Sequence, residues 1–222
     1  MAEDYRVVKA DFDGIAALSE TPWNHNNAYF PYLMRLVPGA ARNALDIGCG
    51  KGELSAMLAE RRIHVTAVDL SEGMIERARE IHPSENIDYV CANVLEMDVP
   101  DESIDLIITT ATAHHLPYDW LLCFAKKKLR RGGRLLILDL YKEQGIYEHI
   151  LSAAAVVPNI VMNYIKNGRM REDEHAKSLW AQHGAHDTYM TLREIHKAAE
   201  TLDGYRLRRL LFWRYLLMWD KP

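Results

Sequence analysis

The sequence predicts a doubly wound α/β fold, in which a parallel sheet carries helices on both faces. From Ala44 onwards, short apolar runs alternate with amphipathic helical patterns. The runs are apolar at nearly every position, as strands buried on both faces are. The chain closes with two β-like runs, within "YRLRRLLFWRYLLMW", that no long crossover separates. We therefore expect a parallel sheet with an antiparallel hairpin at one edge.

Each expected strand leads through a turn into a helix. The strands are expected at residues 44–47, 64–70, 87–92, 104–111 and, after a glycine turn at 131–133, at 134–141, and the helices between them at 53–62, 72–82 and 118–130. Ser71 is the expected N-cap of the second helix, and Thr191 with Glu194 predicts a capping box for a later one. Connections between parallel strands are almost always right-handed, which sets the handedness of this sheet but not its strand order.

Composition narrows the classes of function. The chain has 222 residues, 49% of them hydrophobic and 26% charged, which indicates one globular domain with additions. A net charge of −4 provides no basic field, so we expect neither nucleic acid nor a membrane as a partner. Cys49, Cys91 and Cys123 form no CxxC pair, which favours a cytoplasmic protein. The most apolar window, 150–165, is too short to span a bilayer.

The first βα turn, "DIGCGKGELS", predicts a ligand site. Its glycines, Gly48, Gly50 and Gly52, let the backbone approach a ligand closely. Dinucleotide sites use the spacing G-x-G-x-x-G, whereas this turn reads G-x-G-x-G behind Asp46. At about 4 Å and an effective dielectric near 20, that carboxylate would repel a phosphate by roughly 4 kcal/mol. The turn therefore favours a cationic ligand.

S-adenosylmethionine fits this turn because it carries a sulfonium and an ammonium group and no phosphate. Its ammonium would approach the acidic end of the strand at Asp46. Asp69 ends the next predicted strand, about 20 residues after the first glycine, where a carboxylate accepts hydrogen bonds from ribose hydroxyls. Asp69 alone would suit NAD equally well, and Asp46 makes the distinction.

Four stretches in order, "LDIGCGKGELS", "VTAVDLSEGMIERAR", "IDLIITTATAHHL" and "LRRGGRLLILDL", resemble the class I S-adenosylmethionine-dependent methyltransferases, particularly the group that methylates ubiquinone and similar metabolites. The match covers residues 44–140 and the terminal hairpin. It implies a Rossmann-like seven-stranded sheet whose last strand is antiparallel, with S-adenosylmethionine as cofactor and S-adenosylhomocysteine as product.

The resemblance also implies roles for single residues. The turn from Asp46 to Gly50 would hold the methionine part, with Gly52 allowing close helix packing, and Asp69 the ribose. Asn93 stands where the family usually has an aspartate, but its side-chain oxygen can still accept a hydrogen bond from the adenine amine. The positions so implied for the cofactor are Tyr29, Asp46, Gly48, Cys49, Gly50, Gly52, Asp69, Leu70, Met74, Asn93, Val94, Thr110 and Ala111.

The sequence offers candidates for the chemistry but no fixed catalytic set. His114 and His115 follow the fourth strand, where the acceptor should lie, and histidine suits a general base. The alternative is that one histidine caps or packs the turn while the other shapes the pocket. Asp139 and Tyr141 end the fifth strand, with hydrogen bonding inside the sheet as the alternative role.

The core at 43–141 is flanked by three parts in the single predicted domain. In similar enzymes the segment corresponding to 1–42 is a helical lid over the cofactor, and His25 and Asn26 fall within it. The alternative is an N-terminal helix that is only anchored by its aromatic residues. Residues 142–187 resemble an acceptor-binding cap, with a homodimer contact as the alternative, and 188–222 form the last helix and hairpin. His175, His183 and His186 are irregularly spaced, so the sequence predicts no metal site.

The expected function is methyl transfer to an oxygen, nitrogen or carbon atom of a small molecule. The fourth strand leads into "TTATAHHL" rather than an Asn-Pro-Pro-Tyr-like tetrapeptide, which disfavours DNA bases as acceptors. Two alternatives remain: a NAD(P)-dependent oxidoreductase on a similar sheet, and a non-catalytic regulatory protein that retains the cofactor fold.

Overall fold

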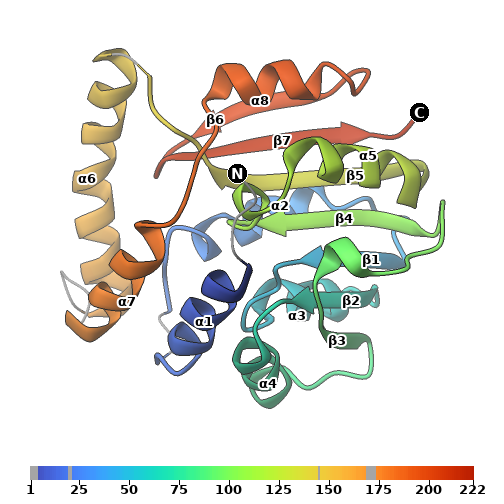
Figure 1. The fold of residues 1–222 in the computed structure, drawn as a ribbon, viewed down its shortest axis with the longest axis horizontal. Coiled ribbons are helices and arrows are strands. Elements are labelled where there is room, and N and C mark those ends of the chain that lie inside the picture. The colour runs from blue at the N-terminus through green and yellow to red at the C-terminus, as the bar shows by residue number, and fades with distance from the viewer. Residues whose placement is uncertain (1–4, 20–21, 145, 169–173) are drawn as a thin grey trace.

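A seven-stranded sheet forms the centre of the protein in a computed structural model that describes residues 5–19, 22–144, 146–168 and 174–222, with backbone alone for 146–155 (Figure 1). The strand order is β3-β2-β1-β4-β5-β7-β6. The strands are β1 (Asn43–Ile47), β2 (His64–Asp69), β3 (Ile87–Cys91), β4 (Ile104–Thr110), β5 (Leu129–Leu140), β6 (Arg206–Leu210) and β7 (Arg214–Asp220). All the strands expected from the sequence are confirmed.

The pairing of the strands confirms the predicted doubly wound sheet. β1 pairs in parallel with both β2 and β4, and the sheet continues in parallel to β3 on one side and β5 on the other. β7 pairs antiparallel with β5 and with β6, so the hairpin forms one edge of the sheet. The strand order reverses between β1 and β4, and ligands of such sheets bind beyond the carboxyl ends of the strands at that point.

Alternate residues of each strand pack on opposite faces, which buries both. On one face, Ile107 of β4 packs with helices α5 and α8. On the other face, Leu106 and Ile108 pack with α2, α3 and α4. The helices are α1 (Tyr5–Ala16), α2 (Phe30–Leu36), α3 (Glu53–Glu60), α4 (Glu72–Ile81), α5 (Tyr118–Lys128), α6 (Ile146–Asn167), α7 (Glu174–Gly184) and α8 (Leu192–Ala199), with 3₁₀ turns η1 (Asn27–Tyr29), η2 (Val94–Glu96) and η3 (Ala113–His115).

Both predicted helix caps are present. The Ser71 hydroxyl accepts a hydrogen bond from the Met74 N–H at the start of α4. Thr191 and Glu194 form the reciprocal capping box of α8. Each cap satisfies backbone donors that a helix terminus leaves without intrahelical partners, and so marks where the helix begins.

The fifth strand starts earlier than the sequence indicates. It was expected after a glycine turn at residues 131–133, but β5 begins at Leu129 and runs through both glycines. The ladder with β4 is irregular between Ile104 and Leu106. A Cβ on Gly133 would lie 2.9 Å from the Arg130 carbonyl oxygen. Gly133 therefore allows a close backbone approach within the strand, and does not end it.

Helices α6 and α7 stand at the side of the sheet toward which β4 points (Figure 1). Asparagines fix α6 to the N-terminal segment: Asn167 bonds the Trp23 backbone at 2.8 and 2.9 Å, and Asn159 bonds His25 at 2.8 Å. In the part of the chain that the structure describes, no helix is long and apolar enough to cross a membrane.

Candidate functional site

The turn between β1 and α3 places its three glycines in different surroundings. All three have positive φ, a conformation that favours glycine. A Cβ on Gly48 would lie 2.1 Å from the Thr112 hydroxyl oxygen, and one on Gly52 would lie 2.7 Å from the Tyr89 hydroxyl oxygen. A Cβ on Gly50 would meet no atom of the described residues within 4 Å, apart from its chain neighbours. Gly48 and Gly52 therefore permit close packing, while Gly50 presents backbone on an open side.

Asp46 is buried at the end of β1, with 1% of its surface exposed. One carboxylate oxygen accepts a hydrogen bond from the Ser55 hydroxyl at 2.6 Å. Burial raises the pKa of Asp46 to about 7, although the Ser55 bond lowers it in part. The carboxyl group thus titrates near neutral pH, and a cation beside it would favour its ionised form.

Asp69 holds the turn through the backbone. Its two oxygens accept hydrogen bonds from the N–H of Gly50 at 2.8 Å and of Ser71 at 2.9 Å. Burial raises the pKa of Asp69, while these backbone bonds act in the opposite direction. The carboxylate at the end of β2 and the open glycine of the first turn are therefore neighbours, as the predicted binding of one ligand by both requires.

Helix α1 covers the start of α4. The Asp13 carboxylate accepts hydrogen bonds from the Ser71 hydroxyl at 2.6 Å and the Gly73 N–H at 3.2 Å. Met74, expected on the adenine, is buried against Ile15 and Ala16 of this helix. An adenine contact by Met74 would therefore involve the α1 side chains as well.

The other residues assigned to the cofactor lie on the side of the sheet where the parallel strands end. Asn93 caps η2, since its side-chain oxygen accepts a hydrogen bond from the Leu95 N–H at 3.1 Å. Ala111 directly follows β4 with a φ of 51°. The Tyr29 hydroxyl donates to the Leu211 carbonyl at 2.8 Å, in the turn of the hairpin, which lies on this side because β7 starts beside the end of β5. The remaining positions, Cys49, Leu70, Val94 and Thr110, lie in or directly after strand ends and their turns.

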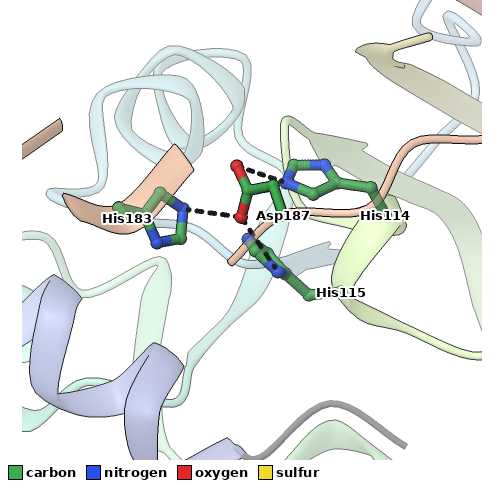
Figure 2. Close-up of side chains that lie close together, drawn as sticks. All are labelled: His114, His115, His183 and Asp187. Carbon is green, nitrogen blue, oxygen red and sulfur yellow. Dashed lines mark ion pairs between the residues drawn. The ribbon is translucent and has the colours of Figure 1, made fainter. Parts of the chain in front are cut away.

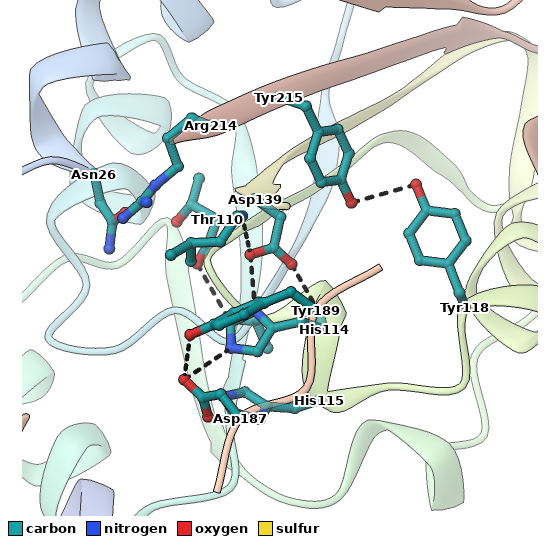
Figure 3. Close-up of polar contacts among 12 residues, drawn as sticks. Asn26, Thr110, His114, His115, Tyr118, Asp139, Asp187, Tyr189, Arg214 and Tyr215 are labelled. Atoms are coloured by element: carbon teal, nitrogen blue, oxygen red, sulfur yellow. Dashed lines mark hydrogen bonds and ion pairs between the residues drawn. The ribbon is translucent and has the colours of Figure 1, made fainter. Parts of the chain in front are cut away.

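His114 is fixed by a buried carboxylate (Figure 3). The Asp139 carboxylate accepts hydrogen bonds from the His114 backbone N–H and lies 2.8 Å from its Nδ1. Burial favours a higher pKa for Asp139, but the charge and hydrogen bond of His114 hold that pKa below its usual value. An ionised carboxylate can only accept a hydrogen bond, so Nδ1 of His114 is the donor. In a neutral ring the lone pair is then on Nε2.

Arg214 of β7 lies above this pair (Figure 3). It is buried, and Asn26 accepts hydrogen bonds from its Nε at 3.1 Å and its Nη2 at 2.8 Å. The N-terminal segment, the hairpin and the end of β5 therefore meet beside the His114 turn. Tyr141, the other candidate at the end of β5, is buried in the core below α5 and α8.

His114 and His115 also meet two residues from a distant segment, His183 of α7 and Asp187 after it (Figure 2). The Asp187 carboxylate lies 3.7 Å from His114 Nε2, 3.5 Å from His183 Nε2 and 4.0 Å from His115 Nδ1. His183 is among the histidines noted in the sequence, whereas Asp187 is not. No local sequence pattern links either residue with His114 and His115. The repeated histidines of the 175–186 segment were the only available signal.

Comparison with known proteins gives the same class as the motifs. Residues 45–137 match a family model described as a methyltransferase domain. The chain is similar to an uncharacterized methyltransferase of Mycobacterium bovis, 26% identical over 91% of this chain and 99% of the relative. It is also similar to the 27-O-demethylrifamycin SV methyltransferase of Amycolatopsis mediterranei, 34% identical over 45% of this chain and 39% of the relative.

Solved structures share the fold. A phosphoethanolamine N-methyltransferase of Haemonchus contortus, in complex with S-adenosylhomocysteine, superposes with a TM-score of 0.61 at 19% identity. The alignment covers 90% of this chain and 42% of that one. The matched domain contains the glycine turn, Asp69 and the His114 turn, on the sheet that the family resemblance implied. The family match, the relatives and the shared fold together support a class I S-adenosylmethionine-dependent methyltransferase.

Proposed function

We propose that the protein transfers the methyl group of S-adenosylmethionine to an oxygen, nitrogen or carbon atom of a small molecule bound beside η3. One observation carries the proposal: the Thr112 side chain packs directly against Gly48. The cofactor turn and the His114 turn are therefore adjacent. Methyl transfer needs the acceptor atom about 3 to 3.5 Å from the methyl carbon, in line with the breaking bond.

The names of the relatives and the net charge of the chain both support a small molecule as the acceptor. By their names, the Amycolatopsis relative and the Haemonchus enzyme act on small molecules. The net charge of −4 offers no attraction to nucleic acid. The match to a methyltransferase family model speaks against the NAD(P)-dependent oxidoreductase considered from the sequence.

We propose that residues 142–187 cover the acceptor and that 1–42 cover the cofactor. Support comes from α1 across the start of α4 and from α6 and α7 beside the carboxyl end of β4 (Figure 1). Helix α6 exposes several apolar side chains, Val156, Val157, Ile160, Val161, Tyr164 and Ile165. The alternative of a homodimer contact through this helix therefore stays open to a measurement of molecular mass in solution.

The three free cysteines support the expectation of a cytoplasmic protein. The catalytic role is a separate question, and the role of His114 or His115 as a general base stays a prediction. Asp139 favours it for His114, because the bond to Nδ1 directs the other ring nitrogen away from the sheet.

A screen of small acceptors tests the proposed function. The protein is incubated with S-adenosylmethionine and candidate metabolites, and S-adenosylhomocysteine formation is followed. We expect release that depends on one acceptor class. In His114→Ala and His115→Ala, turnover should fall about 10²- to 10⁴-fold in at least one variant if a base is needed. The exposed His64→Ala is the control. Unchanged rates in both variants would remove the base, and cofactor binding without turnover on any acceptor would contradict the proposal.

A further inference from the structure

We propose that His114, His115, His183 and Asp187 bind one divalent transition-metal ion, such as Zn²⁺, which joins the 142–187 segment to the core. One ligand atom from each residue can be chosen so that all four lie within 4.8 Å of one another (Figure 2). The inference does not depend on the acceptor proposed above. It makes His114 and His115 ligands of a metal ion and not a general base.

The distances within the cluster suit a shared ion better than direct bonds. Nitrogen–oxygen separations of 3.5, 3.7 and 4.0 Å around Asp187 exceed the length of a hydrogen bond. Four ligands at about 2.1 Å from a tetrahedral ion are roughly 3.4 Å apart. The four side chains thus surround a point at which small adjustments would bring all of them to bonding distance.

A carboxylate orients one of the histidine rings, because Asp139 lies 2.8 Å from Nδ1 of His114. A second carboxylate, that of Asp11, lies 3.5 Å from Nδ1 of His183, which is longer than a hydrogen bond. Nε2 of each ring lies toward Asp187, at 3.7 Å for His114 and 3.5 Å for His183. Metal-binding histidines characteristically pair their other ring nitrogen with a carboxylate, as His114 does, which fixes the tautomer and the ring orientation.

The ligand Asp187 is itself supported, because its Oδ2 accepts a hydrogen bond from the Tyr189 hydroxyl at 2.5 Å. Its other oxygen, Oδ1, is buried and makes no hydrogen bond with the described residues. Gln182 Nε2 donates to Asp11 Oδ1 at 2.8 Å and so steadies the carboxylate behind His183. The orienting contacts therefore extend behind both sides of the cluster.

The donor set selects the class of ion. Three imidazole nitrogens and one carboxylate suit Zn²⁺ and its neighbours in the transition series, whereas Mg²⁺ and Ca²⁺ prefer oxygen ligands. The ligands come from η3, from α7 and from the segment before α8. A bound ion would therefore cross-link elements that are far apart in the sequence, next to the predicted acceptor site.

The test uses tag-free full-length protein, freed of metal with a chelator and then dialysed. Zn²⁺ is titrated against a chromophoric chelator, and Co²⁺ is added separately to record its visible spectrum. We expect one ion per chain, a four-coordinate Co²⁺ spectrum, and no competition by Mg²⁺. His183→Ala and Asp187→Ala should each weaken Zn²⁺ binding by about a hundredfold or more.

His175→Ala is the matched control, since His175 is an exposed histidine of the same helix. It should bind Zn²⁺ like the wild type. Retained calorimetric binding of S-adenosylmethionine shows that each variant is folded. The proposal is overturned if wild-type protein binds no stoichiometric Zn²⁺, or if His183→Ala and Asp187→Ala bind it unchanged. Since these measurements need no acceptor, a negative result leaves the proposed methyl transfer untouched.

Discussion

The glycine turn and the histidine cluster lie at the same edge of the sheet but are built differently. The turn consists mostly of backbone, with Asp69 accepting N–H groups of Gly50 and Ser71. The cluster consists of side chains from segments up to 73 positions apart, His114 to Asp187. A site made of backbone depends on local conformation, whereas one made of side chains depends on how the segments dock. Substitutions should therefore affect the two regions in different ways.

The largest expected effect separates two glycines of the same turn. In Gly48→Ala the new methyl group would overlap Thr112, in addition to the strain of a φ of 71°. We expect a loss of about 4 kcal/mol in the free energy of unfolding. In Gly50→Ala the methyl group meets no protein atom, so only the strain of about 1 kcal/mol applies. Urea unfolding of both variants measures the difference.

When ligand binding is measured, we expect the larger effect in Gly50→Ala, the variant with the smaller loss of stability. Gly50 is the glycine with an open side. Gly50→Ala should therefore remain folded and bind S-adenosylmethionine weakly in calorimetry. Equal stability of the two variants, or normal binding by Gly50→Ala, would mean that the turn does not divide packing and ligand contact in this way.

The next largest effect is expected from removing the Asp69 carboxylate, which joins the glycine turn to the end of β2. Asp69→Ala deletes an acceptor expected to receive hydrogen bonds from the ribose, each worth about 1.5 to 3 kcal/mol when charged. We expect affinity for S-adenosylmethionine to fall about a hundredfold, with circular dichroism unchanged. Asp88→Ala, an exposed aspartate of β3 that pairs with His64, is the control. An unaltered affinity in Asp69→Ala would show the ribose assignment to be wrong.

A smaller effect should appear in the pH dependence of stability. Burial raises the pKa of Asp46 to about 7 in the folded protein, from the ordinary value of 3.8. The folded state therefore binds the proton more tightly. This stabilisation is complete below pH 3.8 and is lost as the pH rises through 7. Between pH 5 and pH 8 we expect the wild type to lose about 2 kcal/mol more than Asp46→Asn does.

Urea unfolding of both proteins at the two pH values gives this difference directly, because other titrating groups are common to both. Equal pH dependence would show that the buried carboxyl group titrates normally, and would weaken its proposed preference for a cation.

The contrast between the regions also explains what the sequence could predict. The strands, the turn and Asp69 were identified because apolar runs, glycine spacing and strand ends are local patterns. The N-cap at Ser71 and the capping box at Thr191 are local in the same sense. The start of β5 was missed because Gly132 and Gly133 read as a turn, while backbone hydrogen bonds to neighbouring segments carry the strand through them.

Long-range docking accounts for the remainder. No spacing rule brings His183 and Asp187 to His114, since helix α5, strand β5 and helix α6 lie between His114 and the helix that carries His183. Similarly, the sequence does not show that α1 packs on Met74, which stays a predicted adenine contact. Features that depend on two docked segments need the structure, whereas those set by one segment follow from the sequence.

Calorimetric titration at pH 6.5 in buffers of different ionisation enthalpy is the most direct test of the ligand assigned to the turn. The account predicts heat with S-adenosylmethionine, release of part of a proton as Asp46 ionises beside the ligand ammonium, and no heat with NADH at about a millimolar. Binding of NADH, or binding of S-adenosylmethionine without linked proton release, would contradict it.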